Sequence, residues 1–206
     1  MTTEGEVSDE LVEKAVKAVK EGGVIIFPTD TVYGLGCDPA QGSAVQRIFE
    51  LKQRHDKPLP ILASSIEVIG EVAELSEQAL ELGASFWPGA LTLILKRRKG
   101  KFEEAAMRLP TIGIRVPGHG VPLRIAEVTG GFLVGTSANI AGGKTPAVFE
   151  DVPGELVDHV SLALRSGPCR WGRESTIVDA TKYPPAIVRE GALKRDVVEE
   201  FLRGSL

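Results

Sequence analysis

The chain has 206 residues, of which 43% are hydrophobic and 25% charged, and its formal net charge is −4 at pH 7. This composition is typical of a globular protein and excludes a disordered chain. No segment approaches the ~18 consecutive apolar residues of a membrane-spanning helix, and the acidic N-terminus lacks the basic and apolar regions of a signal peptide. We therefore expect a cytoplasmic protein without a membrane partner. Cys37 and Cys169 have no CxxC spacing and are expected to be reduced, incidental thiols.

One basic run, residues 96–101, interrupts the otherwise acidic sequence. The negative net charge argues against nucleic-acid binding over the whole surface. We interpret the run as a solvated turn after a strand, and contact with RNA is the alternative.

Helical and strand patterns alternate along the chain. Ser8 is the predicted N-cap of a first helix, in which Leu11, Ala15 and Val19 recur at helical spacing. Residues 24–27 predict a buried strand, and a second helix should begin after Ser43. Further strands are predicted over residues 59–63, 91–95, 112–116, 132–135, 160–164, 175–178 and 186–188, and further helices over residues 66–74, 76–86, 121–128 and 196–202. Because these elements interleave without a linker, we predict one α/β domain over residues 1–206, with a mixed sheet.

Familiar nucleotide-binding motifs are incomplete in this sequence. Residues 143–145, Gly-Lys-Thr, resemble the end of a phosphate-binding loop, but Ala138 stands at the required upstream glycine and Pro146 prevents the helix from starting. Residues 34–36, Gly-Leu-Gly, lack the third glycine of a dinucleotide-binding motif. The three histidines show no metal-binding spacing, so no structural metal is predicted. Nucleotide phosphates would therefore have to be held mainly by cationic side chains.

Hydroxyl side chains follow the predicted strand at residues 24–27. If residues 28–36 are extended, Thr29, Thr31 and Tyr33 project to one side and present three hydroxyls together. The alternative is a threonine-rich turn that caps the next element. The local sequence favours neither interpretation.

Cationic side chains gather at Lys52, Arg54 and Lys57. An extended chain would align Lys52 and Arg54 with Lys57 nearby, and three converging cations suit a polyphosphate. The alternative is a helix C-terminus, whose dipole favours cations. Pro58 and Pro60 favour the extended conformation, because a residue before proline is biased away from the helical region.

Polar and cationic residues also follow the later strands. Ser137 and Asn139 are two residues apart, so both can point the same way and bind a nucleotide or an anion. Arg115 and Arg189 end apolar runs that should lie in one sheet. Together with Lys144, these cations predict a basic groove on an acidic protein, which would attract ATP.

Seven short segments follow one another in a distinctive order over most of the chain. They lie at residues 28–36, 52–59, 88–92, 113–117, 136–139, 175–179 and 189–191. Together they resemble the YrdC-type threonylcarbamoyl-AMP synthases. The resemblance implies an open, twisted mixed sheet with flanking helices and a concave basic groove. It also implies ATP, L-threonine and bicarbonate as substrates, with Mg²⁺ accompanying ATP.

On this resemblance, roles can be assigned to individual residues. The catalytic, electrostatic role falls to Lys52, Arg54 and Lys57. ATP binding is assigned to Lys52, Arg54, Ser137, Asn139 and Arg189, and threonine binding to Thr31, Tyr33, Arg115, Thr136 and Ser175. Some family members carry a histidine near the amino-acid site, roughly where this sequence has Leu62. The product would pass to a separate tRNA threonylcarbamoyl transferase, and tRNA itself is a further candidate partner.

Three alternative functions compete with this synthase. The first is a module that binds double-stranded RNA or the tRNA backbone without synthase activity. The second is a carbamoyl-transfer domain like that of hydrogenase-maturation proteins, which is disfavoured because the acylphosphatase and zinc-finger segments of those proteins are missing here. The third is a diverged, inactive paralogue, which the intact Lys52–Arg54 and Ser137–Asn139 segments disfavour.

Overall fold

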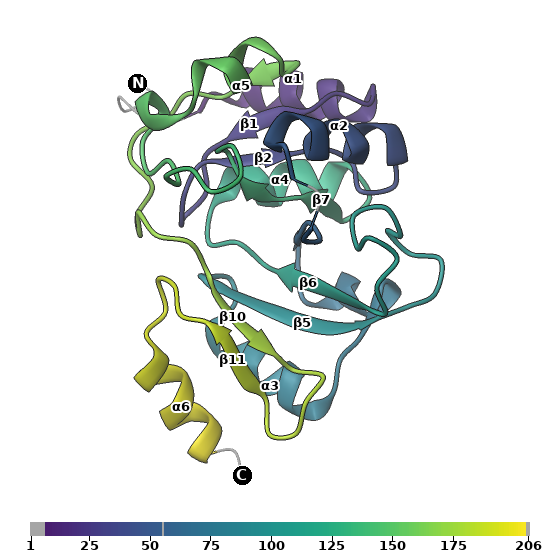
Figure 1. The fold of residues 1–206 in the computed structure, drawn as a ribbon, viewed down its shortest axis with the longest axis vertical. Helices are drawn as coiled ribbons and strands as arrows, with labels where there is room; N and C mark the ends of the chain where they lie inside the picture. The colour runs from purple at the N-terminus through teal and green to yellow at the C-terminus, as the bar shows by residue number, and fades with distance from the viewer. Residues whose placement is uncertain (1–6, 55, 205–206) are drawn as a thin grey trace.

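The strands of this protein form two sheets, as a computed structural model of residues 7–54 and 56–204 shows (Figure 1). Sheet A has the strand order β8-β2-β1-β9 and contains β1 (Ile25–Phe27), β2 (Gly34–Gly36), β8 (Thr136–Ser137) and β9 (Leu162–Ala163). Sheet B has the order β11-β10-β5-β6-β3-β7, with β4 paired to β5. Its strands are β3 (Ile61–Ala63), β4 (Ala73–Glu74), β5 (Leu91–Arg97), β6 (Thr111–Arg115), β7 (Phe132–Val134), β10 (Thr176–Asp179) and β11 (Ala186–Arg189).

Helices cover both sheets. They are α1 (Asp9–Lys20), α2 (Gly42–Lys52), α3 (Glu77–Phe86), α4 (Gly120–Val128), α5 (Gly154–Asp158) and α6 (Arg195–Gly204), with 3₁₀ turns at Glu67–Glu71 and Phe149–Asp151. Figure 1 shows α1, α2 and α5 at the sheet A end of the molecule, and α3 and α6 at the sheet B end. Within the two described ranges, no helix combines the length and the apolar character needed to cross a bilayer.

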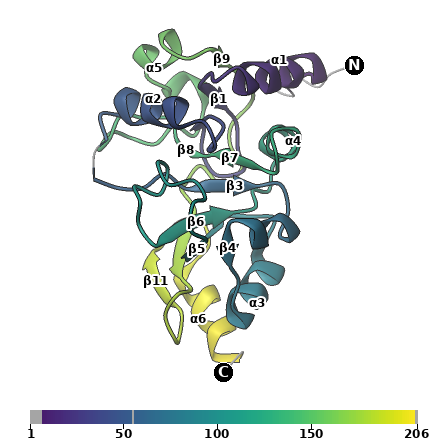
Figure 2. The same cartoon turned by 90° about the vertical axis from the view of Figure 1, so that its right-hand side faces the viewer.

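The N-terminal helix begins where the sequence predicts. The Ser8 hydroxyl accepts a hydrogen bond from the Leu11 N–H, and this N-cap satisfies one of the unpaired amides of the first turn. Val12, Ala15 and Val19 are buried on the face that packs toward α4, whereas Leu11 is exposed. Figure 2 shows α1 and α4 on one side of sheet A and α2 on the other.

Strand β1 therefore lies between two apolar clusters. Ile25 and Phe27 point into the cluster formed with α1 and α4, whereas Ile26 points into the larger cluster formed with α2. Alternate residues of a strand point to opposite faces, so a strand covered on both sides must be apolar throughout. The unbroken run at residues 24–27 predicted this burial correctly.

The two sheets are joined where β7 continues into β8. Val134 of β7 pairs with Ile61 in sheet B, and Thr136 of β8 pairs with Leu35 in sheet A. Gly135 alone separates these strands, and its N–H donates to the Pro60 carbonyl. A Cβ atom on Gly135 would lie 2.4 Å from Cγ of Leu62, so only glycine fits at this crossing.

The predicted α/β class with mixed pairing is confirmed. The pairs β3–β6 and β5–β10 are parallel, and β5–β6 is antiparallel. The strands nevertheless form two sheets where the sequence suggested one. The short strand β2 and helix α5 were not predicted.

The predicted helix at residues 66–74 is wrong. Its first part is the 3₁₀ turn Glu67–Glu71, and its end is the strand β4. Ala73 pairs with Arg97 of β5, so the partner that imposes the extended conformation lies far away in the sequence.

The basic run at residues 96–101 is a turn after a strand, as predicted. Lys96 and Arg97 end β5, and Gly100 has a φ of +81° in the turn that follows. The Arg97 side chain is only 7% exposed and its Nε donates to the Leu109 carbonyl. Arg98 Nε donates to the Gly70 carbonyl. Arg97 is thus buried rather than solvated, and the two arginines tie this turn to the main chain at residues 109 and 70.

The closeness of the two sheets gives a first prediction. A Cβ atom at Gly36 would lie 2.1 Å from the Val134 main-chain oxygen and 2.8 Å from the Phe27 ring. The Gly36→Ala protein should therefore lose about 1–3 kcal/mol of its free energy of unfolding, as overpacked cores do. Urea unfolding measures this loss. Gly154→Ala is the matched control, because a Cβ there meets nothing within 4 Å, and equal stability of the two variants would contradict the close approach.

Candidate functional site

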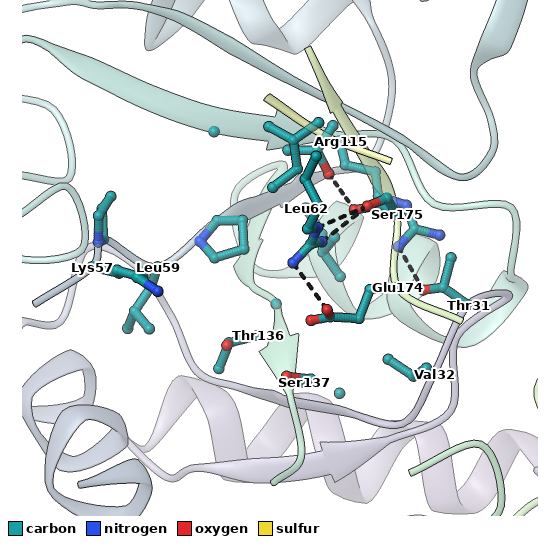
Figure 3. Close-up of a pocket in the computed structure, with 18 of the residues that line it drawn as sticks. Thr31, Val32, Lys57, Leu59, Leu62, Arg115, Thr136, Ser137, Glu174 and Ser175 are labelled. Atoms are coloured by element: carbon teal, nitrogen blue, oxygen red, sulfur yellow. Dashed lines mark hydrogen bonds and ion pairs between the residues drawn. The ribbon is translucent and has the colours of Figure 1, made fainter. Parts of the chain in front are cut away.

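A pocket of about 360 Å³ lies between the two sheets, and one face of sheet B forms its floor (Figure 3). The floor residues are Thr92, Ile94, Thr111, Gly113, Arg115 and Ile177. Because successive residues of a strand point to opposite faces, Leu91, Leu93 and Leu95 of β5 point the other way and are buried in the larger cluster. The floor can therefore carry polar groups without interrupting the core.

The walls of the pocket come from loops and from sheet A. They include residues 29 and 31–34, Arg54, residues 57–60, residues 135–137, and the pairs 174–175 and 188–189. Nine of the eleven predicted site residues line this pocket: Thr31, Tyr33, Arg54, Lys57, Arg115, Thr136, Ser137, Ser175 and Arg189. Lys52 and Asn139 are not among the lining residues. Most of the predicted set is thus brought together from six separate segments.

The threonine-rich loop after β1 is both a turn and a wall of the pocket. Thr29 Oγ1 accepts hydrogen bonds from the N–H groups of Thr31 and Val32, at 3.0 and 3.2 Å, and donates to the Val32 carbonyl. The hydroxyls of Thr29 and Thr31 lie 2.9 Å apart. The segment is therefore the threonine-rich turn, and the extended conformation is wrong for residues 30–32, although the turn still presents Thr31 to the pocket.

Tyr33 does not share this side with the two threonines. Its hydroxyl donates to the Ser166 carbonyl at 2.6 Å and accepts from the Ser166 N–H at 2.9 Å. Burial raises the pKa of Tyr33 to about 12, so it stays a neutral donor. The prediction of three hydroxyls on one side is wrong for Tyr33, because its hydroxyl is hydrogen-bonded to the main chain of residues 166 and 167, which are remote in sequence.

The Arg115 guanidinium is held from three directions. Its Nε donates to the Gly89 carbonyl at 2.8 Å, its Nη1 donates to Thr31 Oγ1 at 2.7 Å, and its Nη2 is ion-paired with Asp30 Oδ1. Burial lowers the pKa of Arg115, and the adjacent Asp30 opposes this shift. A guanidinium has five N–H groups, so these contacts leave donors for a ligand. Asp30 was missed by the sequence analysis, although it lies between the two threonines.

Two cations enter the pocket from the segment after α2. Arg54 Nε donates to the Lys57 carbonyl and Arg54 Nη2 to the Pro58 carbonyl, both at 2.9 Å. These bonds brace the turn that leads to β3, and Lys57 itself is exposed at the edge of the pocket. Arg54 and Lys57 therefore both line the pocket, and Arg54 is positioned by the carbonyls of residues 57 and 58.

A third cation comes from the end of β11. Arg189 Nη2 and Nε donate to the Ser175 carbonyl at 2.9 and 3.3 Å, and Nη1 is ion-paired with Glu174 Oε2 at 3.0 Å. The Ser175 hydroxyl lies 2.8 Å from that of Thr92. Thr92 and Glu174 were not predicted as site residues. With Arg115, the lining residues include four cations and a single carboxylate, that of Glu174.

Lys52 lies behind the pocket wall. It is the last residue of α2, and the left-handed Gln53 (φ 50°) caps that helix, so the predicted extended alignment with Arg54 is wrong. Lys52 is 2% exposed. Its ammonium donates to the main-chain carbonyls of Ser137 and Asn139, the latter at 2.7 Å. Burial lowers the pKa of Lys52 to about 8, and the nearby Arg54 adds to this effect.

Ser137 and Asn139 contact each other, whereas they were predicted to point together toward a ligand. Ser137 Oγ donates to Asn139 Oδ1 at 2.6 Å, and Asn139 Nδ2 donates to the Gly143 carbonyl at 2.7 Å. Asn139 is therefore an internal brace of the loop, and Ser137 is the member that reaches the pocket. The predicted place of Lys144 in the groove is wrong, because Lys144 is exposed, ion-paired with Asp151 at 3.0 Å, and not among the lining residues.

The pocket residues do not fit a resident metal ion. Within the described ranges, no cluster of three or more His, Cys, Asp or Glu side chains could hold one. The single lining carboxylate, Glu174, is already paired with Arg189. Mg²⁺ in an ATP-dependent reaction would therefore be held chiefly by the nucleotide's own phosphates.

The residues that form this pocket lie within a segment that matches a known protein family. The model of the Sua5/YciO/YrdC family, described as telomere recombination, matches residues 17–191. That match spans most of the chain and every segment of the pocket. The chain belongs to the Sua5/YciO/YrdC family.

Members of this family match the chain over most of its length. The threonylcarbamoyl-AMP synthase of Pyrococcus abyssi is 36% identical over 186 residues, 89% of this chain but 55% of that protein. The threonylcarbamoyl-AMP synthase of Vibrio campbellii is 31% identical over 183 residues, 87% of this chain and 98% of that protein. The crystal structure of Pyrococcus abyssi Sua5 complexed with L-threonine superposes with a TM-score of 0.91 at 33% identity, covering 97% of this chain and 59% of that one. The chain thus spans little more than half the length of the Pyrococcus proteins, and the fold predicted from the resemblance is confirmed.

The burial of Lys52 predicts a pH dependence of stability. Because its pKa in the folded chain, about 8, is below the ordinary 10.5, the unfolded chain binds this proton more tightly between these two values. The charged lysine therefore costs the folded state free energy below pH 8, and this cost is relieved as the pH rises toward 10.5. At about 1.4 kcal/mol per pKa unit, the free energy of unfolding of the wild type should rise relative to Lys52→Met by up to about 3 kcal/mol.

Urea unfolding of both proteins between pH 7 and 10.5 measures this difference, since other titrating groups cancel in the comparison. Lys14→Met, on the exposed face of α1, is the control and should show a much smaller change. If the difference in free energy of unfolding between the wild type and Lys52→Met stayed constant from pH 7 to 10.5, this would be evidence against the buried, carbonyl-bound ammonium.

Proposed function

We propose that this chain is a threonylcarbamoyl-AMP synthase, which joins L-threonine, bicarbonate and ATP and releases pyrophosphate. The observation that carries the proposal is the pocket itself, in which four cations from three segments line a cavity that is also rich in hydroxyls. Cations suit a triphosphate, and hydroxyls with Arg115 suit a small hydroxy amino acid. The names of the Pyrococcus and Vibrio relatives support the same activity.

The proposed reaction begins when the threonine amine forms a carbamate, either by adding to CO₂ with loss of a proton or by condensing with bicarbonate with loss of water. A carbamate oxygen then attacks the α-phosphorus of ATP, the bond to the β-phosphate oxygen breaks, and pyrophosphate leaves. Such a displacement depends on positioning and charge neutralisation rather than on a covalent nucleophile. We assign neutralisation of the triphosphate to Arg54, Lys57 and Arg189.

Ser137 is proposed to bind a phosphate or the ribose from the opposite wall. Lys52 and Asn139 then act through it, because the Lys52 ammonium holds the carbonyls of Ser137 and Asn139, and Asn139 holds the Ser137 hydroxyl. This replaces the direct phosphate contact first assigned to Lys52. The two residues preorganise the wall, and Ser137 contacts the nucleotide.

The threonine side of the site is proposed at Thr31, Thr136, Ser175 and Arg115. Arg115 keeps N–H donors for a carboxylate while Asp30 and Thr31 fix its orientation. Tyr33 supports this region indirectly, by fastening the loop after β1 to residue 166.

Mg²⁺ would enter with ATP. We further propose that residues 1–206 act as one domain in the cytoplasm and that the product passes to a separate tRNA-modifying transferase, with tRNA as a candidate partner.

The decisive test is incubation of the full chain with ATP, Mg²⁺, bicarbonate and an amino acid, with pyrophosphate and the adduct followed by mass. Release should require both bicarbonate and threonine. A pocket that hydrogen-bonds the threonine hydroxyl should reject valine by ~10⁴ but serine by only ~10–200-fold. Tight, steeply salt-dependent RNA binding without such turnover would instead favour the RNA-binding module.

Arg54 provides the sharpest variant for this assay. Removing one preorganised donor at a site of developing charge costs about 10²–10³ in rate, so Arg54→Ala should slow pyrophosphate release by that factor. Arg47→Ala is the matched control, since Arg47 lies on the exposed face of α2 in an ion pair with Glu50. Thermal unfolding of both variants separates a loss of activity from a loss of fold. Near-wild-type turnover by Arg54→Ala would overturn its assignment.

A further inference from the structure

Glu174 is an anion inside a site that must receive anions. Among the described residues that line the pocket it supplies the only carboxylate, beside Arg54, Lys57, Arg115 and Arg189. In Figure 3 its side chain points into the pocket, on the side of Thr136 and Ser137. A phosphate group bound at Arg189 would lie beside this carboxylate.

The main chain at Glu174 is packed against its neighbours, whereas its side chain is partly exposed. The Glu174 carbonyl accepts from the Ala192 N–H at 2.8 Å, and a Cβ atom on Gly191 would lie 2.2 Å from that carbonyl oxygen. By contrast, the side chains of Glu174 and Arg189 are 36% and 39% exposed. A half-exposed ion pair of this kind contributes little stability and exchanges readily with solvent or with another anion.

Arg189 does not need Glu174 to keep its position. Two of its nitrogens, Nη2 and Nε, donate to the Ser175 carbonyl, and only Nη1 contacts Glu174. Arg54 is likewise oriented by the carbonyls of residues 57 and 58 and not by a carboxylate. The Glu174 carboxylate therefore neutralises the cations of the pocket without being required for their geometry.

We propose that Glu174 is an internal competitor of phosphate, whose carboxylate occupies Arg189 in the empty pocket and weakens the binding of pyrophosphate. The inference builds on the proposed function, in which pyrophosphate is a product. A carboxylate beside a multiply charged anion repels it, and the repulsion grows with the charge of the ligand. Pyrophosphate without metal should be repelled more strongly than ATP with Mg²⁺, whose net charge is lower. This stronger repulsion would favour the release of pyrophosphate over that of ATP with Mg²⁺. Product release limits turnover in many enzymes.

Calorimetric titration of the full chain with pyrophosphate, without divalent metal, tests this competitor. Glu174→Gln removes the charge and keeps the shape, so it should bind pyrophosphate about tenfold more tightly than the wild type. The gain for ATP with Mg²⁺ should be smaller, and the affinity for adenosine, which has no phosphate, should be unchanged. Glu199→Gln is the matched control, because Glu199 pairs with Arg195 at 3.2 Å on α6, away from the pocket.

The outcomes separate this inference from the proposed function. Tighter pyrophosphate binding by Glu174→Gln alone supports the competitor. Equal or weaker binding overturns it, and weaker binding would indicate that the carboxylate helps to hold the ligand. If the wild type still makes the threonine adduct in that case, only the inference fails. If neither protein binds ATP or pyrophosphate, both the inference and the proposed function are overturned. Thermal unfolding of each variant confirms that it is folded.

Discussion

Strands β7 and β8 belong to different sheets although only Gly135 separates them. This crossing depends on the missing side chain, since a Cβ atom would collide with Leu62. It brings the end of sheet A against the open face of sheet B, and the pocket lies at that junction. Thr136 and Ser137 enter the wall as soon as the chain leaves Gly135. The positions of Thr136 and Ser137 in the wall therefore depend on this close approach.

The buried ammonium of Lys52 holds the wall formed at this junction, and no carboxylate of the described residues is ion-paired with it. A buried charge is costly unless it is well hydrogen-bonded, and Lys52 meets this requirement with the carbonyls of Ser137 and Asn139. A hydrogen bond also runs in the other direction, since the Ala141 N–H of the loop donates to the main-chain carbonyl of Lys52. The C-terminus of α2 and the loop after β8 thus fix each other, and the orientation of Ser137 follows from both.

The cations around the pocket differ in how far they are neutralised. Arg115 is buried with Asp30, Arg189 shares a half-exposed pair with Glu174, and Arg54 is oriented by carbonyls alone. Arg115 is therefore suited to one fixed ligand position, such as a carboxylate. Arg54, Lys57 and Arg189 form a looser and more accessible set, which suits phosphates that must arrive and leave. The two parts of the proposed site, for threonine and for ATP, follow this division.

The sequence by itself determined the helix that starts at Ser8, the buried strand β1 and most of the residues that gather in the pocket. The helix and the strand were predicted because capping and hydrophobic periodicity act over a few residues of chain. The pocket residues were predicted mainly from the family resemblance of their segments. It could not determine that residues 73–74 pair with β5, that Tyr33 turns its hydroxyl to residue 166, or that Lys52 binds carbonyls behind the wall. Only the tertiary structure decided these points, because each partner lies far away in the sequence. A buried polar group adopts the conformation in which it is hydrogen-bonded, and its partner can come from any part of the chain.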